Sequence, residues 1–237
     1  MSVPAAPVVS PPERDVPERD VPERDAPTGR RTYRPGLTVA DLSERFGPIP
    51  ATRVLREPPP GEATVADWEA ANRRGPGLYE LIDGTLIEKA VSDLSSSIGL
   101  TIGALLWNFV TPRRLGHLHG ADGFFNLPDG LRAPDVSFTP AADRPDGLVA
   151  RGFSDVPPAL VVEVLSPGNT AQEMRRKRAV YFAAGVVRVW EVDPDTRTAT
   201  VWRGPDDAAT FRHDDVVPGE PVLPGFELKL SDVFPAG

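Results

Sequence analysis

Apolar positions along the chain switch between helical and strand spacing, and this switching predicts an α/β fold. Helical spacing recurs in four segments, at residues 37–47, 64–73, 94–109 and 170–184. Short apolar runs bounded by glycine, proline and aspartate lie between them and predict β-strands. The order of these elements favours a mixed β-sheet flanked by helices.

Capping residues and helix breakers mark where several helices begin and end. Thr170 and Glu173 have the spacing of a capping box, and Gly185 follows the last residue of that helix. Pro112 is expected to end the long helix that begins near Leu94. This long helix should be mostly buried, because its apolar positions recur at i, i+4 and i+7.

The clearest hairpin signal is Asp83-Gly84, which joins apolar runs at residues 78–82 and 85–88. Further strands are expected at 123–126, 135–138, 161–165, 186–192, 198–202 and 226–230. A turn at residues 128–130 is expected between the first two of these strands.

The N-terminal part of the chain has a different composition from the rest. Prolines crowd into the first 60 residues, and a short Pro-Glu-Arg-Asp repeat starts at Pro12, Pro17 and Pro22. We expect residues 1–31 to form a disordered tail and residues 32–61 an N-terminal extension with a short helix and a linker. Residues 62–237 should form the folded domain.

Composition excludes several classes of protein. Cysteine is absent, so disulfides and thiolate metal sites are excluded, and any metal must take oxygen or nitrogen ligands. No basic, apolar leader and no apolar run of about 20 residues is present, so we expect a cytoplasmic protein that does not enter membranes. The net charge of −8 argues against a uniformly basic surface but allows a local basic groove.

Glu163 is the most informative residue, because it stands within the apolar run 159–165. An ionised carboxylate buried there needs a compensating cation, and an arginine at the strand end would be an ordinary solution. Two other residues point to chemistry: Asp135 begins a predicted strand, and Lys177 lies on the helix after Glu163. Lysine occurs at only three positions, whereas arginine is common, so its choice at Lys177 is conspicuous.

If the strands of Asp135 and Glu163 are neighbours, their carboxylates meet on one side of the sheet and the next helix brings Lys177 over them. Carboxylate oxygens, water and a substrate phosphate are the ligands that Mg²⁺ prefers, and Mn²⁺ accepts them too. One metal ion or two would fit. Lys177 would then orient a water or stabilise the charge of a phosphate in reaction.

Five motifs, in order, resemble the signatures of the Uma-two family of bacterial restriction endonucleases, within the PD-(D/E)xK phosphodiesterase superfamily. The resemblance runs from about residue 62 to residue 234, and residues 37–60 resemble an extension found in some members. The motifs are Tyr79-Glu80-Leu81-Ile82-Asp83-Gly84, Pro134-Asp135-Val136, Val162-Glu163-Val164-Leu165-Ser166-Pro167, Lys177-x-x-x-Tyr181 and Val189-Trp190-Glu191-Val192-Asp193-Pro194.

This resemblance implies a restriction-endonuclease-like fold for residues 62–237 and a Mg²⁺- or Mn²⁺-dependent endonuclease that hydrolyses DNA. Asp135 and Glu163 would be the metal ligands, Lys177 the catalytic lysine and Glu80 a supplementary catalytic acid. The implied partner is nucleic acid, with DNA as the leading interpretation, and a homodimer stays open.

Two positions depart from the family pattern. Leu165 occupies the third place of the superfamily motif, where lysine is usual, so the lysine would have to come from Lys177. Ser95 stands near the place where many members carry a histidine. Phosphate contacts are expected from the arginines that flank Lys177, at Arg175, Arg176 and Arg178.

Each candidate residue also has an ordinary structural explanation. Lys177 follows Glu173 by four residues, which is also the spacing of an ordinary exposed helical ion pair. Glu80 and Glu88 alternate with apolar neighbours, a pattern that is also typical of solvent-facing strand residues. His117-x-His119 has the spacing of two zinc ligands on one strand face, but the sequence offers no third ligand nearby.

The chemistry leaves two alternative functions. One is a catalytically inactive protein of the same fold that binds nucleic acid or protein. The other is a two-carboxylate glycosidase, which would need no metal and would leave Lys177 without a role. Metal dependence distinguishes the leading interpretation from both.

Overall fold

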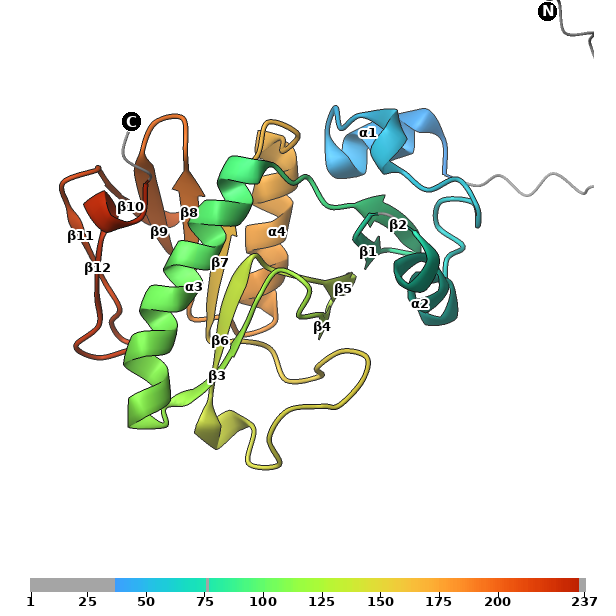
Figure 1. The fold of residues 1–237 in the computed structure, drawn as a ribbon. Helices are drawn as coiled ribbons and strands as arrows, with labels where there is room; N and C mark the ends of the chain where they lie inside the picture. The colour runs from blue at the N-terminus through green and yellow to red at the C-terminus, as the bar shows by residue number, and fades with distance from the viewer. Residues whose placement is uncertain (1–36, 76, 235–237) are drawn as a thin grey trace, which may run out of the picture. The chain divides into compact units, whose positions relative to one another are not determined.

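The computed structural model describes residues 37–75 and 77–234 (Figure 1). The chain divides into two compact units, residues 1–34 and 35–237, and the described residues belong to the second. The predicted disordered tail, residues 1–31, lies outside the described residues. The second unit has mixed α/β architecture, as the hydrophobic pattern predicts.

The central sheet contains six strands and is the frame on which the candidate residues sit. The strands are β3 (Gly116–His119), β6 (Val136–Pro140), β7 (Leu160–Val164), β8 (Arg188–Asp193), β9 (Thr198–Gly204) and β10 (Asp207–Phe211). Their order across the sheet is β10-β9-β8-β7-β6-β3. Strands β7 and β8 pair in parallel, whereas the other neighbours are antiparallel, so the sheet is mixed.

Two helices cover opposite faces of this sheet, α3 (Asp93–Arg113) and α4 (Ala171–Ala183) (Figure 1). Ile102 of α3 packs in one core cluster with Val162 of β7. Tyr181 of α4 packs in another with Val161, the preceding residue of the same strand. Because successive residues of a strand point to opposite faces, these contacts place the helices on the two sides.

A second sheet of four antiparallel strands, in the order β2-β1-β5-β4, lies beside the first. Its strands are β1 (Tyr79–Ile82), β2 (Thr85–Glu88), β4 (Phe125–Leu127) and β5 (Gly130–Arg132). The β1–β2 hairpin forms as predicted, with positive φ at Asp83 and Gly84. Strand β5 was not predicted: the turn at residues 128–130 joins β4 to β5 and not β4 to β6.

Helix α3 corrects three expectations. It ends at Arg113 and holds Pro112 in its last turn. Its buried apolar residues are Ile98, Ile102, Leu106 and Val110. The helical spacing in the sequence instead favours Thr101, Leu105 and Phe109 after Ile98, so the buried stripe is shifted by one residue. By length and composition it is apolar enough to cross a membrane, contrary to the expectation that no segment is, although it packs on the sheet as core helices do.

The N-terminal extension packs on the hairpin. Helix α1 (Val39–Phe46) begins at a capping box on Thr38, and its Phe46 is buried with Ile82 and Ile87. The short 3₁₀ helix η1 (Ala51–Arg53) follows, and α2 (Val65–Arg74) begins at Thr64, the predicted cap. The remaining short elements are η2 (Ala141–Asp143), β11 (Val216–Pro218), β12 (Glu227–Lys229) and η3 (Leu230–Asp232).

Candidate active site

Asp135 immediately precedes β6, and Glu163 lies on its antiparallel neighbour β7. Val136, the first residue of β6, pairs with Val162 of β7, so Asp135 and Glu163 each lie one residue beyond this pair. Asp135 Oδ2 accepts a hydrogen bond of 2.8 Å from the backbone nitrogen of Val164. Asp135, 28 residues before Glu163, thus lies beside the end of β7, close enough for its charge to act on Glu163, while its side chain lines a groove on the α3 side.

Lys177 reaches Glu163 from α4. Its Nζ donates a hydrogen bond of 2.8 Å to Glu163 Oε2, and the Tyr181 hydroxyl donates to Glu163 Oε1. The side chains of Lys177 and Glu163 are each 5% exposed. The alternative that Lys177 and Glu173 form only an exposed pair is therefore wrong, because Lys177 faces the sheet and Glu173 pairs with Arg53.

Glu80 lies on β1 of the hairpin, where it is buried and does not face solvent. Its Oε1 accepts a hydrogen bond of 3.0 Å from the backbone nitrogen of Ala133, and its Oε2 accepts one of 3.3 Å from Arg132 Nη1. Arg132 also pairs with Asp129 at 2.7 Å. Glu80 thus holds the segment that leads into Asp135, while its neighbour on the hairpin, Glu88, stays partly exposed.

Sequence reasoning missed Lys89, which follows β2 directly. Its Nζ donates to Asp135 Oδ1 at 3.0 Å, to Ala133 O at 2.6 Å and to Ala121 O at 3.1 Å. The side chain is 3% exposed. The rarity of lysine was the available signal: two of the three lysines lie at this site, and only one was selected from the sequence.

Burial and neighbouring carboxylates shift the pKa values of Glu163 and Lys177. Burial raises the pKa of Glu163, and the nearby carboxylate of Asp135 raises it further against the opposing effect of Lys177. Burial alone would lower the pKa of Lys177, but Glu163 and other nearby carboxylates raise it above its ordinary value. Both directions indicate an acid-rich environment, in which negative charge is disfavoured and positive charge is favoured.

The donor set fits a hard divalent cation. Two carboxylates on adjacent strands supply oxygen ligands, and each ionised oxygen has a second lone pair beyond its hydrogen bond. Within residues 37–75 and 77–234 no cluster of three histidine, cysteine, aspartate or glutamate side chains occurs. A cation that keeps several waters and needs only one or two carboxylates, such as Mg²⁺, matches this set.

A zinc site at His117 and His119 finds no support in the described residues. His119 Nε2 lies 3.4 Å from Arg144 Nη1, and its ring packs edge-on against Phe125. Burial, the positive charge of Arg144 and that of a protonated His117 lower the pKa of His119. With no third ligand beside them, the two histidines lack the set that zinc sites use.

Asp135 is where the site meets solvent. Its side chain is 17% exposed, more than those of Glu163, Lys177 and Lys89. It lines a groove of about 780 Å³ between α3 and the β3 region, a size typical of ligand clefts. Ser95, which stands near the family's histidine position, lines the same groove and accepts a hydrogen bond from Ser166 at 2.8 Å.

The arginines around Lys177 do not gather on one surface. Arg178 is buried: its Nη1 donates to Glu191 Oε1 at 2.7 Å, and its guanidinium stacks 3.8 Å from the Trp202 ring centroid. The expectation that Arg178 contacts phosphate is therefore wrong, because its position on the helix directs the side chain toward β8 and β9.

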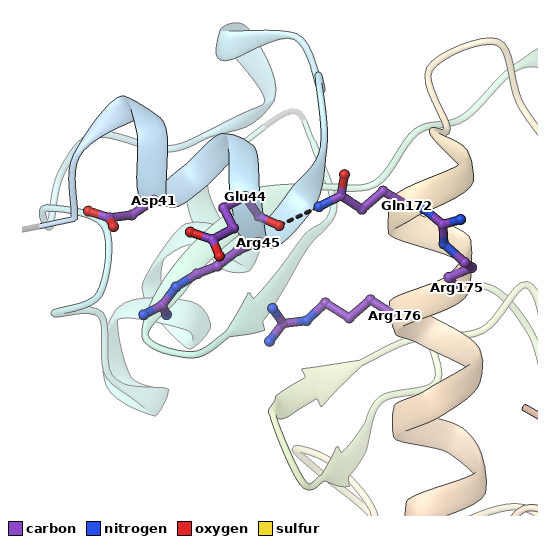
Figure 2. A pocket seen from close by; sticks show the side chains of 6 residues that line it. All are labelled: Asp41, Glu44, Arg45, Gln172, Arg175 and Arg176. Carbon is purple, nitrogen blue, oxygen red and sulfur yellow. Dashed lines mark hydrogen bonds between the residues drawn. The ribbon is translucent and has the colours of Figure 1, made fainter.

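Arg175 and Arg176 instead line a pocket between α1 and α4, together with Arg45 (Figure 2). Arg176 extends from α4 and pairs with Asp83 and Asp129, whereas no ion pair of Arg175 is found in the described part of the chain. Arg175 is thus the exposed cation of this helix, on the side away from Lys177.

Two comparisons with known proteins gave matches. The sequence model of a family described as "Uma2: Putative restriction endonuclease" matches residues 65–231. A crystal structure titled as a "putative nuclease belonging to DUF820", from Anabaena variabilis, aligns with a TM-score of 0.61 and 22% identity, covering 68% of this chain and 91% of that one. That likeness shows the fold. Curated proteins gave no match.

Proposed function

The chain belongs to the Uma2 family, and from this membership and the geometry around Asp135 we propose that it is a metal-dependent phosphodiesterase, an endonuclease acting on DNA. Asp135 and Glu163 are the proposed metal ligands and Lys177 the proposed catalytic lysine. Mg²⁺ or Mn²⁺ bound there would supply Lewis-acid chemistry, lowering the pKa of a water and neutralising phosphate charge.

One observation carries the proposal. Asp135 accepts a hydrogen bond from the backbone of Val164, the residue after Glu163, and Lys177 donates one to Glu163 itself, so residues that are ordinary one by one lie near one another. Glu163 is buried and Asp135 partly buried, and neighbouring negative charges of this kind favour a bound cation.

The raised pKa of Lys177 supports a role for its charged ammonium in orienting a water or stabilising phosphate charge. A lysine that holds its proton near neutral pH acts as a fixed positive charge and not as a base. Lys177 therefore stabilises negative charge on the phosphate and orients Glu163, while its hydrogen bond with Glu163 keeps it directed at the sheet. Glu80 acts as a positioning residue, through Ala133, and does not touch the substrate.

The test is cleavage of duplex DNA, single-stranded DNA and RNA by the full chain with Mg²⁺, with Mn²⁺ and with EDTA. We expect metal-dependent cleavage of DNA by the wild type and its loss in Asp135→Asn and in Lys177→Met. Asp143→Asn, an exposed aspartate beyond β6, and Lys229→Met, an exposed lysine, are matched controls that should cleave as the wild type does.

Three outcomes separate the competing functions. Cleavage that persists in EDTA overturns the metal-dependent mechanism. Binding of DNA with no cleavage under any metal favours the inactive nucleic-acid-binding alternative. Cleavage of RNA and not of DNA retains the phosphodiesterase and changes its substrate.

A further inference from the structure

We propose that Lys89 is a resident cation of this site and limits it to one divalent ion instead of two. The inference rests on the proposed metal site and concerns how many ions that site holds. Lys89 stands against Asp135 on the side opposite Val164: its Nζ contacts Oδ1, while the backbone nitrogen of Val164 contacts Oδ2.

All three N–H donors of the Lys89 ammonium group have acceptors. An ammonium carries three N–H donors, and three oxygens accept them, on Ala121, Ala133 and Asp135. Two of these acceptors are backbone carbonyls, so the lysine stays anchored when Asp135 shares its charge with another cation. Moving Nζ away would leave buried carbonyls without donors, which is costly.

The base of the side chain is also fixed. Lys89 directly follows β2, and its backbone nitrogen donates a hydrogen bond of 2.8 Å to Leu78 O. The residue is buried, so the four-carbon stem has little freedom to swing the ammonium out of the site. Lys89 is thus a preorganised positive charge rather than a mobile surface lysine.

A second divalent ion would have to share this place. Metal pairs in phosphodiesterase sites stand about 3.5–4 Å apart and bridge through a common carboxylate. The outer oxygen of Asp135 already has a cation at 3.0 Å, and a divalent ion beside that ammonium would meet strong like-charge repulsion. A metal ion would therefore favour the oxygen of Asp135 that lies against β7, away from the ammonium.

The three acceptors would themselves make a cation site without the lysine. Two backbone carbonyls and a carboxylate oxygen are the hard ligands that divalent cations take. Removing the ammonium while keeping most of the stem should therefore let a second ion enter. A merely structural role for Lys89 predicts reduced stability but an unchanged number of bound ions.

The experiment is a Mn²⁺ titration of the full-length wild type by calorimetry, with electron paramagnetic resonance of the saturated protein. We expect one ion per wild-type chain, with the spectrum of an isolated ion. Lys89→Met should bind two ions and show the spectrum of a coupled pair. Lys89→Arg, which keeps the cation, and Lys229→Met, the exposed lysine control, should each bind one.

The wild type alone makes the inference falsifiable, even where Lys89→Met does not fold. Two ions per wild-type chain overturn it and leave the proposed phosphodiesterase intact. One ion in both the wild type and a folded Lys89→Met also overturns it. No Mn²⁺ binding by the wild type overturns the proposed metal site itself, and the inference with it.

Discussion

Arg53 of the N-terminal extension forms a two-point hydrogen-bonded ion pair with Glu173 of α4. Its guanidinium donates to Glu173 Oε1 at 2.8 Å and to Oε2 at 3.2 Å, and both side chains are buried. The same guanidinium donates to the backbone oxygens of Gly168 and Glu88. An extension 120 residues away in sequence thus fixes the first turn of the helix that carries Lys177.

Replacing Arg53 tests this connection. Arg53→Met should lower the free energy of unfolding by about 3–5 kcal/mol, because Glu173 would remain buried without its cation. Urea denaturation followed by circular dichroism measures the change. The double variant Arg53→Met/Glu173→Leu removes both charges and should recover most of the loss. A loss below about 1 kcal/mol, typical of exposed pairs, would mean that the pair is solvated in solution.

The same pair predicts a pH dependence of stability. Burial would raise the pKa of Glu173, but the hydrogen bond and charge of Arg53, aided by Lys177, hold the pKa below 4.5. A carboxyl whose pKa is lowered by folding contributes stability above its unfolded pKa and loses it as the pH falls through the folded pKa. The stability difference between wild type and Glu173→Gln should therefore stay constant above about pH 5.5 and shrink below pH 4.5.

Denaturation at a series of pH values measures that difference directly. A difference that grows as the pH falls would contradict the sign of the Glu173 shift. Asp143→Asn, at an exposed aspartate, is a suitable control for the effect of a substitution as such.

Glu163→Gln tests the interior of the site. From sequence alone, removing one of two neighbouring carboxylates should relieve repulsion and preserve stability without metal. The structure changes that expectation, because Glu163 is the ion-pair partner of the buried Lys177. Glu163→Gln should destabilise the metal-free protein by about 3 kcal/mol, as removal of one partner from a buried pair does.

Thermal and urea unfolding in EDTA measure this effect. The double variant Glu163→Gln/Lys177→Met, which removes both charges, should be more stable than Glu163→Gln alone. Unchanged stability of the single variant would contradict this prediction, because relief of repulsion from Asp135 would then offset the loss of the pair with Lys177.

Local patterns were sufficient to predict the elements that carry the candidate residues. The apolar run around Glu163 forms the central strand β7, and the capping box at Thr170 starts α4, so Lys177 returns over that strand. The turn at Asp83-Gly84 fixes the hairpin. Each of these depends on residues within a few positions of one another, which is the range over which sequence patterns are informative.

Contacts between distant segments could not be predicted in the same way. Alternation along β1 is compatible with a solvent-facing Glu80, and only the approach of Arg132, 52 residues later, shows that this face is covered. Lys89 meets Asp135 across 46 residues. Strand β5 is three residues long and pairs on both sides, so its hydrogen bonds define it better than its apolar pattern does.

The arginines of α4 give the last prediction, which separates a phosphate contact from a structural pair. Arg175 is exposed, and Arg176 is held by Asp83 and Asp129. Each phosphate that a cation neutralises adds about 0.9 to the slope of log affinity against log salt on duplex DNA. Arg175→Gln should weaken DNA binding and flatten the slope by about that amount, whereas Arg176→Gln should lower stability and leave the slope unchanged. Fluorescence anisotropy across a salt series, with Ca²⁺ in place of Mg²⁺, measures both slopes. If Arg176→Gln flattens the slope and Arg175→Gln does not, DNA approaches from the side of the hairpin and displaces the pair with Asp83.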